Sequence, residues 1–247
     1  KGDISVTLDA RDALLTLASG SISTGTSAGT ITLVTDDIDF TSGADRVSGT
    51  GQLVIKTRNV GQGYLLGGAG QSVYGTDTST SAIADGYMAL GVHELEALKH
   101  GFAQIQIGTA GSFMAIGDAR DMDLGTVHFN GRFTDPLLLI ADELVVKGNV
   151  QSTEAITTRS RLLQVQSRNL RDPLGAPDSG LSAPVLNLNV DEQADISGWL
   201  IGANQVNLTI SQSDDDLAFL MRHDSDLYNR WQAGQDYALR VLIAGVN

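Results

Sequence analysis

The chain lacks cysteine altogether and has few prolines, aromatic residues and lysines. The absence of Cys from 247 residues excludes disulfides and thiolate metal sites. Aromatic residues make up only 5% of the sequence, so the core must consist mainly of Leu, Ile, Val and Ala. The 16 Lys and Arg residues stand against 29 Asp and Glu residues, for a formal net charge of −13. An acidic surface disfavours phosphate backbones, and we therefore expect no nucleic-acid partner.

Long hydrophobic runs are also missing. No apolar stretch approaches the roughly 18–20 residues that a membrane-spanning helix needs, so we expect no membrane insertion. The sequence shows no signal peptide, and its first residue is Lys1 rather than Met. We interpret the chain as a piece of a longer protein.

What the chain does contain is many short strand-like runs separated by small polar residues. The most informative stretch, from Thr30 to Gly68, holds three of them: Ile31–Val34, Leu53–Lys56 and Tyr64–Leu66. In the first two, apolar residues alternate and so fall on one face of a strand. Similar runs recur along the whole chain, a pattern typical of a sandwich, a barrel or a β-solenoid.

The turns favour a solenoid over a sandwich. Asn-Gly and Asp-Gly pairs, which form two-residue hairpins, occur only at Asp85-Gly86 and Asn130-Gly131. Parallel stacking of successive coils needs no such hairpins. We expect each coil to supply a few inward apolar residues, namely Leu33, Ile55, Leu65, Ile107, Ile116, Phe129, Leu139, Val145, Leu163, Leu188 and Leu208.

Other segments interrupt the strand pattern. The polar stretch 69–90 is expected to be a surface loop, and residues 91–101 are predicted to form a short amphipathic helix. Asp214–Asp216 can cap a helix over Leu217–Met221, whereas Tyr237–Val246 is predicted to be a strand. Amides that alternate with apolar residues, such as Gln104 and Gln106 or Asn187 and Asn189, either stack into ladders between coils or simply face solvent.

Residues 90–150 contain a recognisable repeat. The segments LGVHELEALKHGFAQIQIG, FMAIGD and VHFNGRFTDPLLLIADELVVKGNV resemble the repeats of giant filamentous-haemagglutinin-like bacterial proteins. The preceding segment, ITLVTDDIDF to GTGQLVIKTRNVGQGYLLGG, is similar to the part before the helix in those repeats. The likeness covers residues 30–166. It implies an all-β, right-handed parallel β-helix (β-solenoid) inside a very large secreted surface protein, where such segments serve as adhesin stalks or scaffold.

Acidic clusters are the only metal-site candidates. Ca²⁺ takes six to eight oxygen ligands, and alternate residues of an irregular turn can converge on one ion. No cluster matches an EF-hand or a calcium roll, and solvated turn acids are the alternative reading. The candidate calcium ligands are Asp36, Asp37, Asp39, Asp118, Asp121 and Asp123.

No catalytic motif is present, and we do not expect an enzyme. A polysaccharide-cleaving β-helix needs an acid pair, or Ca²⁺ with a basic residue, on one face. The only set dense enough is Asp118, Arg120, Asp121, Asp123, Arg132 and Lys147.

The sequence therefore predicts a parallel β-helix over residues 1–213, followed by a divergent, partly helical terminal coil over 214–247. We expect a structural or adhesive scaffold segment at the bacterial cell surface, with a carbohydrate-binding or polysaccharide-cleaving β-helix as the alternative. The expected partners are other copies or neighbouring segments of the same protein, and cell-surface carbohydrate. No cofactor is expected apart from Ca²⁺.

Overall fold

The computed structural model describes residues 2–10, 13–40, 43–66, 87–116, 130–146, 149–165, 180–196 and 199–245. The chain divides into two compact units, Lys1–Thr209 and Ile210–Asn247. Among the described residues, the first unit contains strands and one short helix, and the second contains two helices.

The strands of the first unit are short at its beginning and long at its end. In chain order they are β1 (Ile4–Thr7), β2 (Leu14–Thr16), β3 (Ile22–Ser23), β4 (Ile31–Val34), β5 (Asp37–Asp39), β6 (Val47–Ser48), β7 (Gln52–Lys56), β8 (Gly63–Leu66), β9 (Tyr87–Leu90), β10 (Gln104–Gly108), β11 (Phe113–Ile116), β12 (Asn130–Phe133), β13 (Leu137–Ile140), β14 (Glu143–Val146), β15 (Asn149–Ser152), β16 (Ile156–Val165), β17 (Gly180–Ile196) and β18 (Trp199–Ile210). The helix α2 (Val92–Glu96) lies between β9 and β10.

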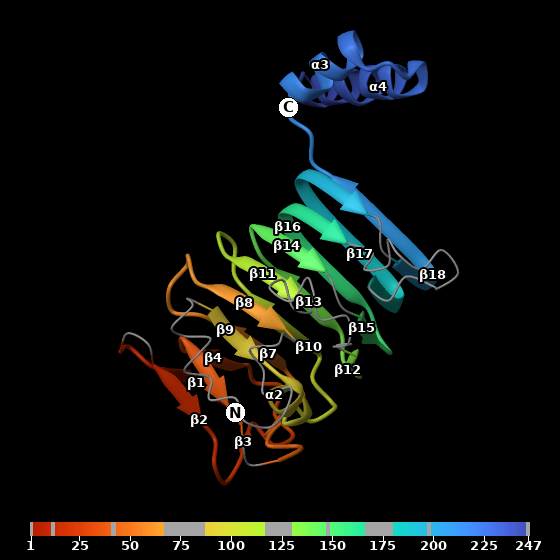
Figure 1. Ribbon diagram of the computed structural model, residues 1–247. Helices are drawn as coiled ribbons and strands as arrows, with labels where there is room; N and C mark the ends of the chain where they lie inside the picture. The colour runs from red at the N-terminus through yellow and green to blue at the C-terminus, as the bar shows by residue number, and fades with distance from the viewer. Residues whose placement is uncertain are drawn as a thin grey trace, which may run out of the picture. The chain divides into compact units, whose positions relative to one another are not determined.

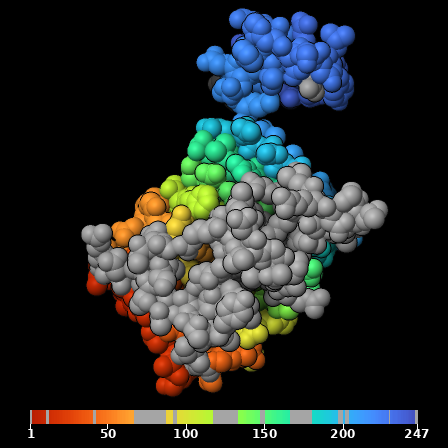
Figure 2. All heavy atoms as spheres, in the orientation of Figure 1, coloured from red at the N-terminus to blue at the C-terminus, as the bar shows by residue number. Residues whose placement is uncertain are grey.

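Strands that are distant in sequence pair side by side in parallel. Along one path the order is β1, β4, β7, β10, β13 and β16, and it returns through β14, β11, β8 and β9 (Figure 1). The sequence separation between paired residues is uneven. Ile31 pairs with Leu53, whereas Leu53 pairs with Ile105, which lies much further along the chain. In the space-filling view, the colour of the described atoms of this unit changes from red to cyan along the stack of strands (Figure 2).

The prediction of a right-handed parallel β-helix (β-solenoid) is wrong. The main sheet has 14 strands and is open, curling into a half-barrel, while β2–β5 and β3–β6 form separate two-stranded sheets. The first half of β16 pairs with β13 and its second half with β14, and its pairing with β17 shifts register between Ser160 and Leu162. Twist and such bulges bend a long strand continuously. Alternating apolar residues predict which face turns inward, but they do not specify this curl.

The core follows the alternation of the strands closely. Seven of the eleven predicted inward residues lie in the buried core cluster, from Leu33 to Leu188; Leu65 and Val145 are buried outside that cluster, and Phe129 lies outside the described residues. Leu208 is 46% exposed, so its prediction is wrong. Its strand, β18, pairs only with β17 among the described strands, and therefore lacks a neighbour on the other side.

The helix predicted over residues 91–101 is shorter than expected. It ends at Glu96, and the next residues pair with β6 instead. The amide of Val47 donates to the carbonyl of Ala97 at 2.8 Å, and the amide of Lys99 donates to the carbonyl of Val47 at 2.8 Å. These strand-like bonds replace the next helical turn. Leu95 and Leu98 still pack against the core, as the amphipathic pattern predicts.

Some amides on the outer face of the sheet do form ladders. Gln52 donates to Gln104 at 3.3 Å, and Asn207 donates to Asn187 at 2.8 Å. Asn187 in turn lies 3.5 Å from the hydroxyl of Thr157. The neighbouring strands therefore stack in register along this face.

The second unit is a helical pair, α3 (Asp214–His223) and α4 (Leu227–Ala244). The predicted helix over Leu217–Met221 lies within α3, and a capping box between Ser213 and Asp216 begins it. The strand predicted over Tyr237–Val246 is wrong, because its residues up to Ala244 belong to α4. A short continuous apolar run does not distinguish a strand from a helix by periodicity alone.

Candidate functional site

The first group of predicted calcium ligands lies at the bend between β4 and β5. Asp36 and Asp37 are buried, and Asp39 at the end of β5 is half-buried. The Asp37 carboxylate accepts a hydrogen bond from the amide of Ala89 at 3.0 Å, which joins β5 to the edge of β9. The amides of Asp36 and Asp37 both donate to the carbonyl of Ala13. At least one of these acids, Asp37, therefore has a structural role at this bend.

The second group, Asp118, Asp121 and Asp123, lies outside the described residues. Within the described part of the chain, no three His, Asp or Glu side chains are grouped so that they could hold a metal ion. Calcium binding at the acidic clusters stays a prediction.

Chelation tests the calcium prediction. A ligand that binds only the folded state stabilises it, by about 2.7 kcal/mol when its free concentration is about 100 times its Kd. EDTA should then lower the melting temperature by roughly 5–10 °C for a chain of this size, and excess Ca²⁺ should restore it. Differential scanning calorimetry measures the shift, with Asp118→Asn and Asp36→Asn variants separating the two clusters. A melting temperature that EDTA leaves unchanged contradicts the prediction.

A buried acid elsewhere in the fold holds a turn together. Asp135, which precedes β13, accepts hydrogen bonds from the amides of Gly101 and Phe102 at 3.0–3.1 Å. Its carboxylate also lies 2.7 Å from Nδ1 of His100. These contacts fix the entry to β10, and they leave Asp135 a structural residue.

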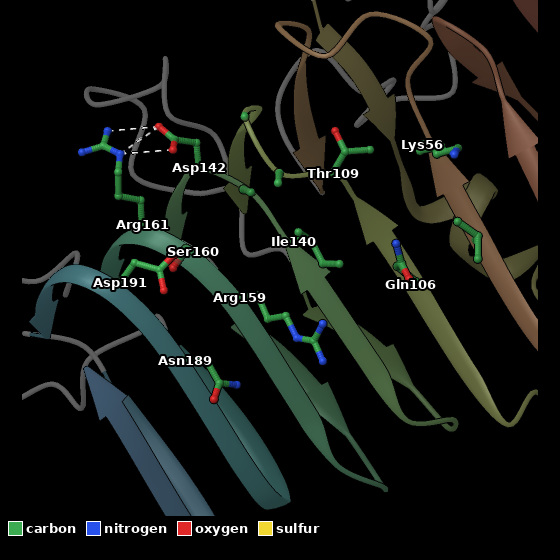
Figure 3. Close-up of a pocket in the computed structure, with 14 residues that line it drawn as sticks. Lys56, Gln106, Thr109, Ile140, Asp142, Arg159, Ser160, Arg161, Asn189 and Asp191 are labelled. Carbon is green, nitrogen blue, oxygen red and sulfur yellow. Dashed lines mark hydrogen bonds and ion pairs between the residues drawn. The ribbon is translucent and has the colours of Figure 1, made fainter. Parts of the chain in front are cut away.

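An open groove of about 650 Å³ crosses the outer face of the curled sheet (Figure 3). Strands β7, β10, β13, β16 and β17 all contribute to it, so it runs across the stack rather than along one strand. The lining residues are Val54, Lys56, Gln106, Thr109, Ala110, Gly111, Ile140, Ala141, Asp142, Arg159, Ser160, Arg161, Asn189 and Asp191.

At one end of the groove, Arg161 is fully engaged by acids. Its Nε and Nη2 donate to the Asp142 carboxylate at 3.0–3.2 Å, and its Nη1 donates to Glu192 at 2.8 Å. The hydrogen bonds from Arg161 hold the pKa of Asp142 below its usual range. Figure 3 shows this guanidinium directed at Asp142.

Two other cations in the groove are not paired in this way. Lys56 and Arg159 make no ion pair within the described part of the chain. Both belong to one outward row. Ile55 pairs with Ile107, so the next residues along, Lys56 and Gly108, are neighbours; Gly108 pairs with Ile140, and Ile140 pairs with Arg159. Arg159 is exposed and Lys56 half-buried.

Sequence reasoning did not identify this groove. Of the six residues proposed for polysaccharide cleavage, only Arg132 is described, as part of β12. Lys56 and Arg159 are more than a hundred residues apart, and nothing in their local sequences indicates that three strand pairings align them. The sequence did offer one indication: Lys56 and Arg159 occupy outward positions in strands whose alternate residues are apolar and buried.

A second notable surface lies on β18. Asn207 stacks on Asn187, so Val206 and Leu208 point to the opposite face, as Leu186 and Leu188 do in β17. Leu186 and Leu188 are fully buried, whereas Val206 and Leu208 are 42% and 46% exposed. The apolar row of the core therefore continues onto β18, which pairs with no described strand other than β17.

The helical unit also exposes apolar side chains. Leu217 and Ala233 are buried between α3 and α4, but many of the larger residues are not. The exposed set comprises Phe219, Met221, Leu227, Tyr228, Trp231, Leu239, Val241, Leu242 and Ile243. None of the described helices is long and apolar enough to cross a membrane.

Comparison with known protein families gives a match within the helical unit. Residues 214–247 match a family described as "Domain of unknown function (DUF3458_C) ARM repeats". No curated protein and no solved structure matches the chain. The matched residues span the helices α3 and α4, and the similarity leaves the strand unit unassigned.

Proposed function

We propose that the chain is a structural segment of a large extracellular protein of the bacterial surface, and that it acts by assembly rather than by turnover. The observation that carries the proposal is the apolar row on β18, where Val206 and Leu208 continue a buried row yet are 42% and 46% exposed. The resemblance of residues 30–166 to filamentous-haemagglutinin-like repeats supports the surface location.

The β18 edge is suited to pairing with a further strand. An edge strand presents unpaired N–H and C=O groups, and an uncovered apolar row beside them adds a hydrophobic contact. Fully burying a Val or Leu side chain contributes about 1.5–3 kcal/mol. A strand laid on β18 gains both kinds of interaction at once.

The opposite edge offers a complementary surface. β1 pairs only with β4 among the described strands, and its Ile4 and Val6 are half-buried against the core. Contact between the β18 edge of one copy and the β1 edge of another joins two different surfaces. Such a head-to-tail contact repeats from copy to copy and builds either a ring or a filament, depending on the rotation between successive copies. Neighbouring segments of the same protein can make the same contact.

The helical unit supports assembly independently. Its family match describes ARM repeats, which bury their apolar faces by stacking on neighbouring helix pairs. Trp231 and Leu242, at 57% and 67% exposed, are among the residues that such stacking would cover.

The assembly proposal predicts that Leu208→Lys weakens self-association. A lysine in the apolar row places a charge where another strand must pack, a device that natural edge strands use against pairing. In sedimentation velocity, we expect the unmodified chain to gain mass with rising concentration and the Leu208→Lys variant to gain clearly less at the same concentrations.

Val60→Lys is the matched control, since Val60 is an exposed apolar residue at 63% in the loop between β7 and β8. It should associate like the unmodified chain. An unmodified chain that remains monomeric at every concentration, or a Leu208→Lys variant that associates normally, contradicts assembly through β18.

A further inference from the structure

We infer that the groove across β7, β10, β13, β16 and β17 binds a linear polysaccharide that carries carboxylate groups. This binding goes beyond assembly, because it uses the outer face of the sheet, whereas Val206 and Leu208 lie on the face that continues the core. The groove is open and crosses five strands, which suits an extended chain rather than a compact small molecule.

The first argument is the presence of unpaired cations in an acidic protein. The chain carries a net charge of −13, and Arg161 shows that a groove cation readily acquires acidic partners. Lys56 and Arg159 make no ion pair with the described residues. A guanidinium binds a carboxylate through two parallel hydrogen bonds, and an ammonium binds it as a point charge.

The spacing of these cations selects the kind of polyanion. Lys56 and Arg159 lie in one row with Gly108 and Ile140 between them, so their backbone positions are about 14 Å apart at ~4.8 Å per strand. Carboxylates carried by single sugar units along a polymer can meet cations at such intervals. Duplex DNA carries one charge per about 1.7 Å, a much denser array than two cations about 14 Å apart can match.

The remaining lining suits sugar rings. Val54 and Ile140 are half-buried apolar residues on which the C–H face of a sugar can lie. Gln106 and Asn189 add amides for hydroxyl groups, and the Asn189 side chain is held by a hydrogen bond to the carbonyl of Thr158 at 3.0 Å. In Figure 3, Arg159 lies over the strands between Ile140 and Asn189. Ligand sites of this kind combine an apolar surface with a few placed polar groups.

Affinity electrophoresis in gels containing polygalacturonate tests the inference. We expect the unmodified chain to be retarded and the double variant Lys56→Gln/Arg159→Gln to bind at least about tenfold more weakly, since a hydrogen bond to a charged group contributes that much. Retardation should also fall with added salt. The matched control is Lys99→Gln/Arg222→Gln, which makes the same change in net charge at two exposed residues outside the groove.

Amine labelling of the unmodified chain gives a second readout that depends on no variant. Polygalacturonate should protect Lys56 from acetylation and leave Lys99 reactive. The inference is overturned if the unmodified chain is not retarded, if both double variants lose binding equally, if Lys56 is not protected, or if neutral dextran or duplex DNA binds as well as polygalacturonate.

Discussion

Replacing Ile107 with alanine should destabilise the strand unit by about 2–5 kcal/mol, the usual cost of truncating a fully buried aliphatic side chain. Ile107 is completely buried in β10, and its partners in the adjacent strands, Ile55 and Leu139, are completely buried as well. Removal of its three outer carbons leaves a cavity between two packed layers. The loss appears as a lower midpoint in urea denaturation followed by circular dichroism.

Val60→Ala serves as the control for this prediction, because Val60 is 63% exposed and its truncation removes little packing. We expect that variant to unfold within about 0.5 kcal/mol of the unmodified chain. If Ile107→Ala costs less than about 1 kcal/mol, the stacked core described for β7, β10 and β13 is wrong.

Replacing Gly108 with alanine should also cost about 2–5 kcal/mol. Gly108 ends β10 with a φ of +97°, a backbone conformation that residues with a side chain rarely adopt. An added Cβ would lie 2.6 Å from Cε of Met114 and would clash with the backbone carbonyl oxygen of Ile140. The cost combines backbone strain with the displacement of the paired strand β13.

Gly61→Ala is the matched comparison. A Cβ at Gly61 meets no atom within 4 Å, and Gly61 is not in the positive-φ region. We expect this variant to be as stable as the unmodified chain, or more stable by about 0.4–1 kcal/mol, because alanine restricts the unfolded chain. Thermal unfolding of the two variants side by side measures the difference. Equal melting temperatures would contradict the close approach of β10 and β13 at Gly108.

The core was largely predictable because burial in a strand follows a period of two. Leu33, Ile55 and Ile107 were identified from alternation within their own short runs, and all three are fully buried. Leu208 shows the same local alternation but is exposed, because burial also needs a neighbouring strand that no local pattern reports.

Helix and strand were distinguishable only where polar residues interrupted the apolar ones. Capping residues and acids mark the start of α3, so its core segment was predicted correctly. The Tyr237–Val246 run is apolar almost throughout and predicts a strand, although its residues up to Ala244 lie within a helix that begins at Leu227. Because such a run satisfies both periods, packing against α3 decides its conformation.

By itself, the sequence determined the inward and outward faces of the strands, the parallel tendency of the stacking, the acidic surface and the absence of disulfides. Tertiary structure alone decided the open curl of the sheet, the uncovered row on β18 and the alignment of Lys56 with Arg159. The physical reason is one of range. Side-chain alternation and turn preference act over a few residues, whereas strand register and sheet curvature are set by backbone pairing between residues many tens of positions apart.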